Sequence, residues 1–244
     1  MFGLSDLVGL DVLLHSMQTV YDGCPDDEDR EIFLPPEWLQ KMVHEEGLLG
    51  DKGRKGFYER TRDESGKRVT LARDLSTGEY APRERVKLDI VKAAKGHSQD
   101  PAASLAVMLE QSGPEADMVW DCLLELSSYA ARRIPEIADD IVNIDRAMRW
   151  GFNWDLGPFE AWDAAGVSNC VARMKERGLP VAGWVEEMLA QGRESFYATD
   201  AEGASTYWDA LGGQSRPMPR SDSWLFIADR RASGGVVEKN GEAE

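Results

Sequence analysis

The sequence has 244 residues, of which 28 are Lys or Arg and 44 are Asp or Glu, so its net charge is −16. This acidity argues against a protein that binds DNA or RNA through a basic face, and against a helix that lies on a membrane surface. No apolar run reaches the roughly 18 residues that a transmembrane helix needs. The length suits one large or two small domains.

The cysteines and the first residues bear on where the protein is located. Cys24, Cys122 and Cys170 are far apart and odd in number, which is typical of reduced thiols in a cytoplasmic protein rather than of disulfides or a zinc site. The segment from Met1 to Asp6 lacks the basic residues that begin a signal peptide. We therefore expect a cytoplasmic globular protein.

The first half of the chain predicts two helices and a small β-hairpin. Apolar residues at three- and four-residue steps predict one helix from about residue 4 to residue 21: Leu7, Leu10, Leu14, Met17 and Tyr21. A second helix is expected from Pro36 to Gly47. After a glycine-rich loop over residues 50–56, short extended pieces separated by turn residues predict a hairpin within residues 56–80.

The second half of the chain predicts mostly helices. Asp100-Pro101 marks the start of a helix that runs through Leu109. The helix after Gly113-Pro114 should bury a broad apolar stripe: Met118, Val119, Cys122, Leu123, Leu126 and Ala130. Beyond Pro135, the apolar spacing of Ile137, Ile141, Ile144 and Met148 predicts another helix. Further helices are expected over about residues 159–177 and 184–190, and extended segments at residues 207–208 and 224–227.

Two parts of the chain share the same landmarks in the same order. The pattern Phe-x-x-x-Asp-x-x-Gly begins at Phe2 and again at Phe159, at a constant offset of 157 residues. Farther along, Trp38 matches Trp184, and a Phe-Tyr pair at residues 57–58 matches another at residues 196–197. A tandem duplication explains this shared order better than chance does.

The two copies differ in what precedes them. Helix-rich sequence from Pro114 to Leu156 leads into the second copy, whereas only Met1 stands before Phe2. If the copies are equivalent, the first copy lacks its opening helices, and the chain is a fragment of a longer protein. We expect a mainly α fold of two tandem helical-bundle units, each with a small β-hairpin appendage. Residues 1–112 would form the first, N-terminally incomplete unit, residues 113–232 the second, and residues 233–244 a linker or disordered tail.

The residues from Trp150 to Val167, which include Gly157-Pro158-Phe159-Glu160, resemble the C-terminal helical domain of 3-hydroxyacyl-CoA dehydrogenases. Residues 144–148 fit the same pattern, as do residues 2–12 and 52–58 of the first copy. The resemblance covers about residues 2–60 and 115–212. Two such units in tandem resemble the bacterial multifunctional fatty-acid oxidation proteins, in which a nucleotide-binding domain precedes the pair and an enoyl-CoA hydratase stands at the C-terminal end.

This resemblance implies an NAD-dependent oxidation of 3-hydroxyacyl-CoA in fatty-acid β-oxidation. NAD binding needs a Gly-x-Gly-x-x-Gly turn between a strand and a helix, and no such turn occurs in the sequence. The family's catalytic His–Glu pair belongs to that absent domain, and its helper Asn belongs to the opening helix that the first copy lacks. The segment Val119–Leu123 of the second copy does not replace it. We therefore expect no catalytic, cofactor-binding or metal-binding residue in this chain.

Phe2 and Leu4 are the candidate substrate-binding residues. They stand where the family's first helical unit lines its acyl-binding cleft, so the resemblance implies that they contact the acyl chain of the substrate. Packing in the protein core is the alternative for both side chains.

Other polar groups have an ordinary structural interpretation. His15, His44 and His97 lack the partner and pocket that a general base needs, and we expect them at surface or boundary positions. The loop over residues 50–56 lacks the Gly-Lys-Ser/Thr ending of a phosphate-binding loop and is expected to be a solvated turn. A cluster of three aspartates and one asparagine is expected mainly on the polar face of a helix rather than around a metal: Asp139, Asp140, Asn143 and Asp145.

Two hypotheses about function follow from these observations. The chain would be the substrate-cleft and assembly part of an NAD-dependent 3-hydroxyacyl-CoA dehydrogenase, with acyl-CoA and the absent NAD-binding domain as its partners. The alternative is a non-catalytic helical interaction or dimerisation module. A homodimer fits both hypotheses, because each unit has an apolar face to bury.

Overall fold

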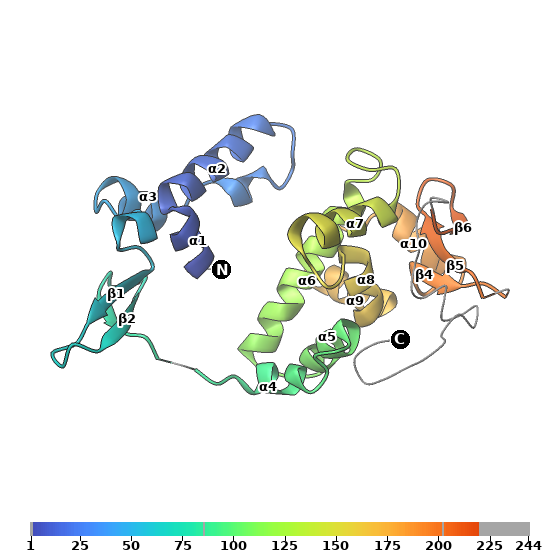
Figure 1. Ribbon diagram of the computed structural model, residues 1–244. Helices are drawn as coiled ribbons and strands as arrows, with labels where there is room; N and C mark the ends of the chain where they lie inside the picture. The colour runs from blue at the N-terminus through green and yellow to red at the C-terminus, as the bar shows by residue number, and fades with distance from the viewer. Residues whose placement is uncertain (1, 85, 202, 220–244) are drawn as a thin grey trace. The chain divides into compact units, whose positions relative to one another are not determined.

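The computed structural model describes residues 2–84, 86–201 and 203–219. The chain divides into two compact units, which we call the first unit (Met1–Val86) and the second unit (Lys87–Glu244) (Figure 1). The expected boundary between the repeat copies, at residues 112–113, stays a prediction. The helices between Val86 and Gly113 belong to the second compact unit.

The first unit begins with two short helices where the sequence pattern predicts one. Gly9 separates α1 (Phe2–Val8) from α2 (Leu10–Gly23) and has a φ of 111°, which residues with a side chain rarely adopt. The predicted single helix from residue 4 to residue 21 is therefore wrong. The remaining helical segments are η1 (Arg30–Phe33), α3 (Glu37–His44) and η2 (Asp51–Gly53). The start of α3 directly after Pro36 confirms the predicted second helix.

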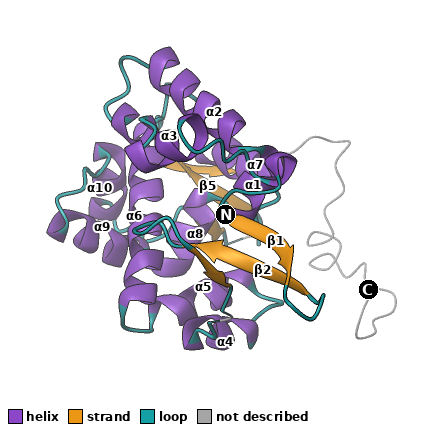
Figure 2. Cartoon of the chain, turned by 90° about the vertical axis from the view of Figure 1, so that its left-hand side faces the viewer, coloured by secondary structure: helices purple, strands orange, loops and turns teal. Residues whose placement is uncertain are grey.

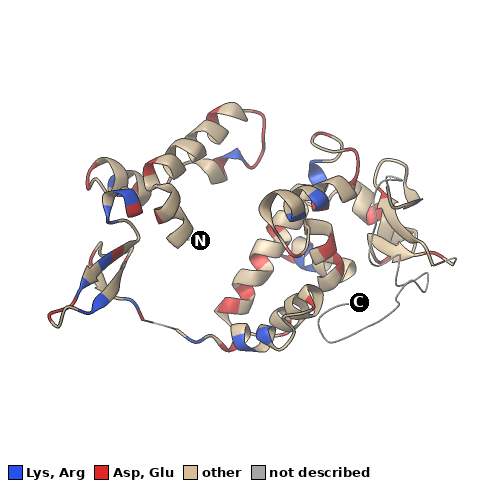
Figure 3. Cartoon of the chain, viewed as in Figure 1, with Lys and Arg blue, Asp and Glu red and all other residues tan. Residues whose placement is uncertain are grey.

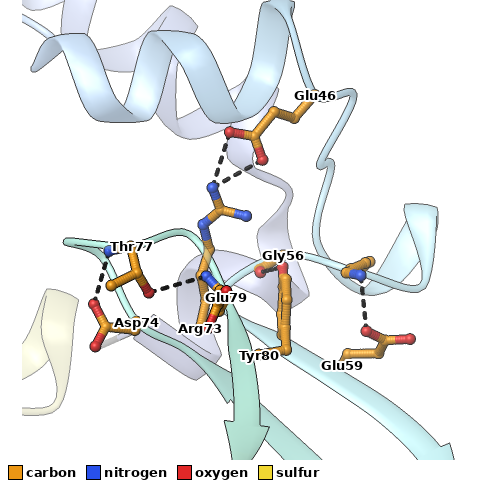
Figure 4. Close-up of polar contacts among 9 residues, drawn as sticks. Glu46, Gly56, Glu59, Arg73, Asp74, Thr77, Glu79 and Tyr80 are labelled. Atoms are coloured by element: carbon orange, nitrogen blue, oxygen red, sulfur yellow. Dashed lines mark hydrogen bonds and ion pairs between the residues drawn. The ribbon is translucent and has the colours of Figure 1, made fainter.

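A three-stranded antiparallel sheet follows these helices. Its strands, in this order, are β1 (Tyr58–Arg62), β2 (Arg68–Arg73) and β3 (Tyr80–Pro82). The predicted hairpin is confirmed, and a third strand extends it. Figure 4 shows how the sheet is tied to its neighbours: the Arg73 guanidinium donates to the Glu46 carboxylate at 2.9 Å, and the Tyr80 hydroxyl donates to the carbonyl of Gly56.

The first unit has a small apolar core. Its buried members are Leu10, Leu39, Met42, Val43, Leu48 and Phe57. Leu13, Leu14 and Met17 of α2 pack against this core and are only partly buried. Leu7, the first residue of the predicted stripe, is 68% exposed, because the turn at Gly9 takes α1 out of line with α2.

The second unit contains most of the helices and a second small sheet (Figure 2). The helices are α4 (Asp89–Lys95), α5 (Pro101–Leu109), α6 (Pro114–Arg132), α7 (Ile141–Phe152), α8 (Pro158–Ala165), α9 (Val167–Glu176) and α10 (Gly183–Ala190). The strands are β4 (Tyr197–Thr199), β5 (Ser205–Asp209) and β6 (Gln214–Pro217), again antiparallel in chain order. The predicted fold class, mainly α with two small β appendages, is confirmed.

Side-chain caps explain two of the helix starts. The Asp100 carboxylate accepts the N–H of Ala103 at 3.0 Å, which confirms the predicted cap of α5. Likewise, the Asp140 carboxylate accepts the N–H of Asn143 at 2.7 Å at the start of α7.

Three predictions made from the sequence pattern are wrong in the second unit. Gly166, with a φ of 84°, separates α8 from α9 within the segment predicted as one helix over residues 159–177. On α6, Met118 is 63% exposed and Cys122 is exposed, and the buried face passes instead through neighbours such as Leu124. Ile137 lies before α7 and is 72% exposed.

The core of the second unit is built around α8. Phe159 and Trp162 of this helix are fully buried. Helices α5, α6, α7 and α9 all contact α8, and α6 also contacts α9. Helix α8, which repeats α1, is therefore covered on several sides.

None of the helices in the described residues is long and apolar enough to cross a membrane. The extended segment expected at residues 224–227 and the tail expected at residues 233–244 lie outside the described residues.

Candidate functional site

A buried carboxylate ties α1 to the sheet of the first unit. Asp6 is 2% exposed, and its two carboxylate oxygens accept the backbone N–H groups of Phe57 and Tyr58, both at 2.8 Å. Hydrogen bonds from backbone N–H groups to a charged acceptor are stronger than neutral ones. We call this arrangement the carboxylate anchor.

Two glycines make room for the anchor. A Cβ at Gly50 would lie 2.8 Å from the Cα of Asp6, and a Cβ at Gly56 would lie 2.7 Å from the Cα of Gly50 and still closer to the Asp6 carboxylate. The loop over residues 50–56 therefore serves to bring the chain close to α1 before β1 begins. Residues 52–54 are exposed, as expected of a solvated turn, whereas Gly50 and Gly56 at its two ends are buried.

Gly56→Ala is expected to lower the free energy of unfolding of the first unit by about 2 kcal/mol, because overpacking a tight site costs about 1–3 kcal/mol. Gly23→Ala is the control, since a Cβ there meets no atom within 4 Å. Urea denaturation of both variants measures the effect. Equal stability of the two variants would contradict the close approach of Gly56 to Asp6.

The second unit repeats the carboxylate anchor. Asp163 of α8 accepts the N–H groups of Phe196 and Tyr197 at 2.7 and 2.9 Å. In both units, the helix that carries the anchor ends at a glycine with positive φ, Gly9 or Gly166. Burial raises the pKa of Asp163 to about 6, although the two N–H donors oppose this rise.

Matching aromatic rings lie beside each anchor. In the first unit, the ring of Phe57 lies 4.6 Å from that of Phe2 and 6.0 Å from that of Trp38, centroid to centroid. The counterparts in the second unit are 5.1 Å for Phe159–Phe196 and 5.7 Å for Trp184–Phe196. The shared contacts confirm the predicted equivalence of these landmarks.

Asp145 of α7 has no counterpart in the described part of the first unit. It is 2% exposed, and its carboxylate accepts the N–H groups of Phe159 and Glu160 at 2.9 and 3.1 Å and the Tyr197 hydroxyl at 2.7 Å. Burial raises its pKa to about 7, and burial together with the nearby carboxylates raises the pKa of Tyr197. The expectation that Asp145 lies on a polar face is wrong, because it caps α8 from within the core.

Phe2 and Leu4 lie on α1 with much of their surface open. Phe2 is 46% exposed and packs on the ring of Phe57, whereas Leu4 is 61% exposed. Phe159, the counterpart of Phe2, is fully buried. The substrate-binding role expected for Phe2 and Leu4 stays a prediction.

The histidines are dispersed rather than gathered into a catalytic group. His15, His44 and His97 are all exposed and lie on α2, on α3 and after α4. Within residues 2–84, 86–201 and 203–219, no group of three His, Cys, Asp or Glu side chains is placed to hold a metal ion. Of the cysteines, only Cys170 is buried, and burial raises the pKa of its thiol to about 12.

Comparison with known proteins supplies the wider context. Residues 1–60 match the family described as 3-hydroxyacyl-CoA dehydrogenase, C-terminal domain. A Bacillus subtilis protein named as a probable 3-hydroxyacyl-CoA dehydrogenase is 33% identical over 242 residues, which are 99% of this chain and 29% of that protein. A Rickettsia felis protein named as a fatty acid oxidation complex trifunctional enzyme is 28% identical over 160 residues, which are 65% of this chain and 20% of that protein.

A third relative, from Deinococcus radiodurans and also named as a probable 3-hydroxyacyl-CoA dehydrogenase, is 41% identical over 66 residues, which are 27% of this chain and 18% of that protein. The chain thus spans less than a third of the length of each of these relatives. Over nearly its whole length, the chain is similar to part of a 3-hydroxyacyl-CoA dehydrogenase, and its first 60 residues are similar to the C-terminal domain of that family.

Proposed function

We propose that this chain is the substrate-cleft and assembly part of an NAD-dependent 3-hydroxyacyl-CoA dehydrogenase of fatty-acid β-oxidation. The observation that carries the proposal is the 33% identity over 242 residues to the Bacillus protein. The reaction of the whole enzyme would transfer a hydride between a 3-hydroxyacyl-CoA and NAD.

The described residues do not fit NAD. Both sheets are small and antiparallel, whereas a dinucleotide lies on a parallel sheet at a glycine turn that leads into a helix. We therefore assign NAD and the catalytic pair to another domain of a longer polypeptide and derive no hydride-transfer step from this chain. An enoyl-CoA hydratase in the same polypeptide is also part of the proposal, supported by the name of the Rickettsia relative.

Phe2 and Leu4 are proposed to contact the acyl chain of the substrate, because α1 presents both side chains partly or largely exposed. The exposed Leu4, Leu7 and Val8 also favour a second candidate, a helical interaction or dimerisation module. A cytoplasmic location belongs to the proposal as well, supported by the three free thiols.

Kinetics of the longer polypeptide test this function. We expect it to oxidise 3-hydroxyacyl-CoA with NAD, whereas calorimetric titration of the 244-residue chain with NAD should give no micromolar binding. In the longer polypeptide, Leu4→Ala should raise KM for a long-chain substrate about tenfold with little change in kcat, since it removes an apolar contact made throughout the reaction.

Leu211→Ala is the matched control, because Leu211 is 57% exposed in the second unit. An inactive longer polypeptide would overturn the proposed function and favour the interaction module. An active enzyme with the same KM in both variants would remove Leu4 from the substrate site.

A further inference from the structure

One face of the sheet in the first unit carries four arginines. Arg60 and Arg62 stand at alternate positions of β1, so their side chains share a face. Arg68 of β2 lies directly opposite Arg62 and therefore on the same face. Tyr58, the first residue of β1, shares this face too, and the Arg83 guanidinium lies 5.1 Å from the centre of its ring. The arginine face, as we call it, consists of Arg60, Arg62, Arg68 and Arg83.

The arginine face gathers positive charge in a chain whose net charge is −16. Figure 3 shows Lys and Arg in blue on β1 and β2. The sheet positions that share this face are 58, 60, 62, 68, 70, 72 and 81, and none of them is Asp or Glu. All four arginines are exposed, and like charges directly opposite one another destabilise a sheet. The arginines therefore lower stability unless a negatively charged ligand neutralises them.

The protein itself neutralises little of this charge. Arg60 forms an ion pair with Asp51 at 3.2 Å, but the Arg60 side chain is 73% exposed, and ion pairs this exposed are weak. Arg62 donates to the backbone carbonyl of Gly66 at 2.7 Å, a neutral acceptor that leaves the charge of Arg62 in place. The Arg68 guanidinium has no hydrogen-bond or ion-pair partner among residues 2–84, 86–201 and 203–219. Arg62 and Arg68 are thus the two arginines most open to an anion.

An open hollow of about 610 Å³ lies against the arginine face. It is lined by Arg60, Thr61, Arg62, Arg68, Val69 and Thr70. Its volume falls within the range of about 300–1,000 Å³ that is typical of small-molecule sites. The planar fork of a guanidinium matches the geometry of phosphate and binds it through two parallel hydrogen bonds. The hollow therefore suits a small molecule that carries several phosphate groups.

The arginine face is continuous with the proposed acyl contacts on α1. Phe2 packs on the ring of Phe57, and a Cβ at Gly3 would lie 3.9 Å from the ring of Tyr58. From Tyr58 to Arg62, β1 extends about 14 Å, at about 3.4 Å per residue. The pantetheine arm that joins the thioester of an acyl-CoA to its diphosphate is of comparable length. One acyl-CoA can therefore place its acyl chain on α1 and its phosphates on the arginine face.

We propose that the arginine face binds the diphosphate and the 3′-phosphate of the CoA part of the substrate. The inference rests on the proposed function, which supplies an acyl-CoA as the ligand. Arg62 and Arg68, which stand side by side, would hold one phosphate group between them. Arg60 would exchange the exposed carboxylate of Asp51 for a second phosphate group.

Calorimetric titration of the 244-residue chain with CoA tests this site directly. We expect CoA to bind, and the double variant Arg62→Gln/Arg68→Gln to weaken its binding at least tenfold, because two phosphate-binding forks are lost. The double variant should fold, since both side chains are exposed. Lys92→Gln/Lys95→Gln is the matched control: it removes the same charge from exposed positions of α4 that have no ion pair among the described residues.

The choice of ligands shows which anion the arginine face recognises. Dephospho-CoA, which lacks the 3′-phosphate, should bind severalfold more weakly than CoA, and so should NAD, which has a diphosphate but no such phosphate. Absence of CoA binding, or equal weakening in both double variants, would overturn the inference. Equal affinities for CoA and NAD would overturn the assignment to CoA. Tighter binding of a polyglutamate peptide than of CoA would assign the face to an acidic protein instead.

Kinetics of the longer polypeptide give an independent measurement. The two substrates to compare are a 3-hydroxyacyl-CoA and the corresponding 3-hydroxyacyl-pantetheine, which ends before the diphosphate. Arg62→Gln/Arg68→Gln should raise KM for the CoA substrate about tenfold more than KM for the pantetheine substrate, because only the first carries the phosphates. Equal changes for both substrates would overturn the inference, since a structural defect affects both alike.

Dehydrogenase activity and CoA binding separate the two proposals. A longer polypeptide that oxidises 3-hydroxyacyl-CoA, in a protein whose arginine face does not bind CoA, would overturn only the CoA site. A longer polypeptide without dehydrogenase activity, in a protein whose arginine face does bind CoA, would overturn only the proposed function.

Discussion

Replacing Asp163 by Ala is expected to lower the free energy of unfolding of the second unit by about 2–4 kcal/mol, because each buried N–H left unpaired costs about 1–3 kcal/mol. The substitution removes the acceptor of the Phe196 and Tyr197 N–H groups. It also cuts the carboxylate link between α8 and the start of β4. Urea denaturation at pH 7, followed by tryptophan fluorescence, measures the change.

Asp155→Ala is the control for this variant, since Asp155 is exposed between α7 and α8. The repeat also predicts that Asp6→Ala destabilises the first unit in the same way, because Asp6 accepts the matching pair of N–H groups. A loss of stability no greater for Asp163→Ala than for Asp155→Ala would show that the anchor contributes little to the fold.

The sequence predicts whether a segment is a helix or a strand better than it predicts the residues at which each element begins and ends. Apolar spacing continues across Gly9 and Gly166, so the pattern predicts one helix where the structure has two. A glycine inside a helical pattern is compatible with a continuous helix, and only the backbone shows that both glycines have positive φ. The sequence does carry one sign of this turn: a Gly stands three residues after the equivalent Asp in both copies, and a repeated Gly indicates a shared backbone turn.

The anchors illustrate which parts of the site a sequence can reveal. The repeat identifies Asp6 and Asp163 as equivalent. The N–H groups of Phe57 and Phe196, which donate to these carboxylates, lie 51 and 33 residues away along the chain, beyond the reach of any local pattern. The apolar and acidic spacing around Asp145 gives no sign of its burial, because it stands among other acidic residues of an amphipathic helix and has no counterpart in the described part of the first unit. Burial decides its role, and burial depends on how α7 packs on α8.

The stability of the second unit is expected to fall as the pH rises from about 4 to about 8. Burial raises the pKa of Asp145 to about 7 and that of Asp163 to about 6. The pKa of an aspartate in an unfolded chain is about 4. Between these values the folded protein binds more protons than the unfolded chain does, and the slope of unfolding free energy against pH is therefore negative. The stabilisation is complete below about pH 4 and is lost through about pH 6–7.

The size of this effect follows from the pKa shifts. One pKa unit corresponds to about 1.4 kcal/mol, so the two carboxyls together should change the unfolding free energy by several kcal/mol. Asp145→Asn keeps a carbonyl acceptor in place and removes the titrating group. We expect this variant to lose the part of the pH dependence that lies near pH 7 and to retain the part near pH 6.

The net charge of −16 also disfavours the compact state as more carboxyls ionise. The control for Asp145→Asn must therefore remove one negative charge as well. Asp155→Asn provides it, because Asp155 is exposed. Urea denaturation between pH 4 and pH 8 should give a smaller slope for Asp145→Asn than for Asp155→Asn. Equal slopes would mean that Asp145 titrates in the folded protein as it does in the unfolded chain, and that its three hydrogen-bond donors offset the effect of burial.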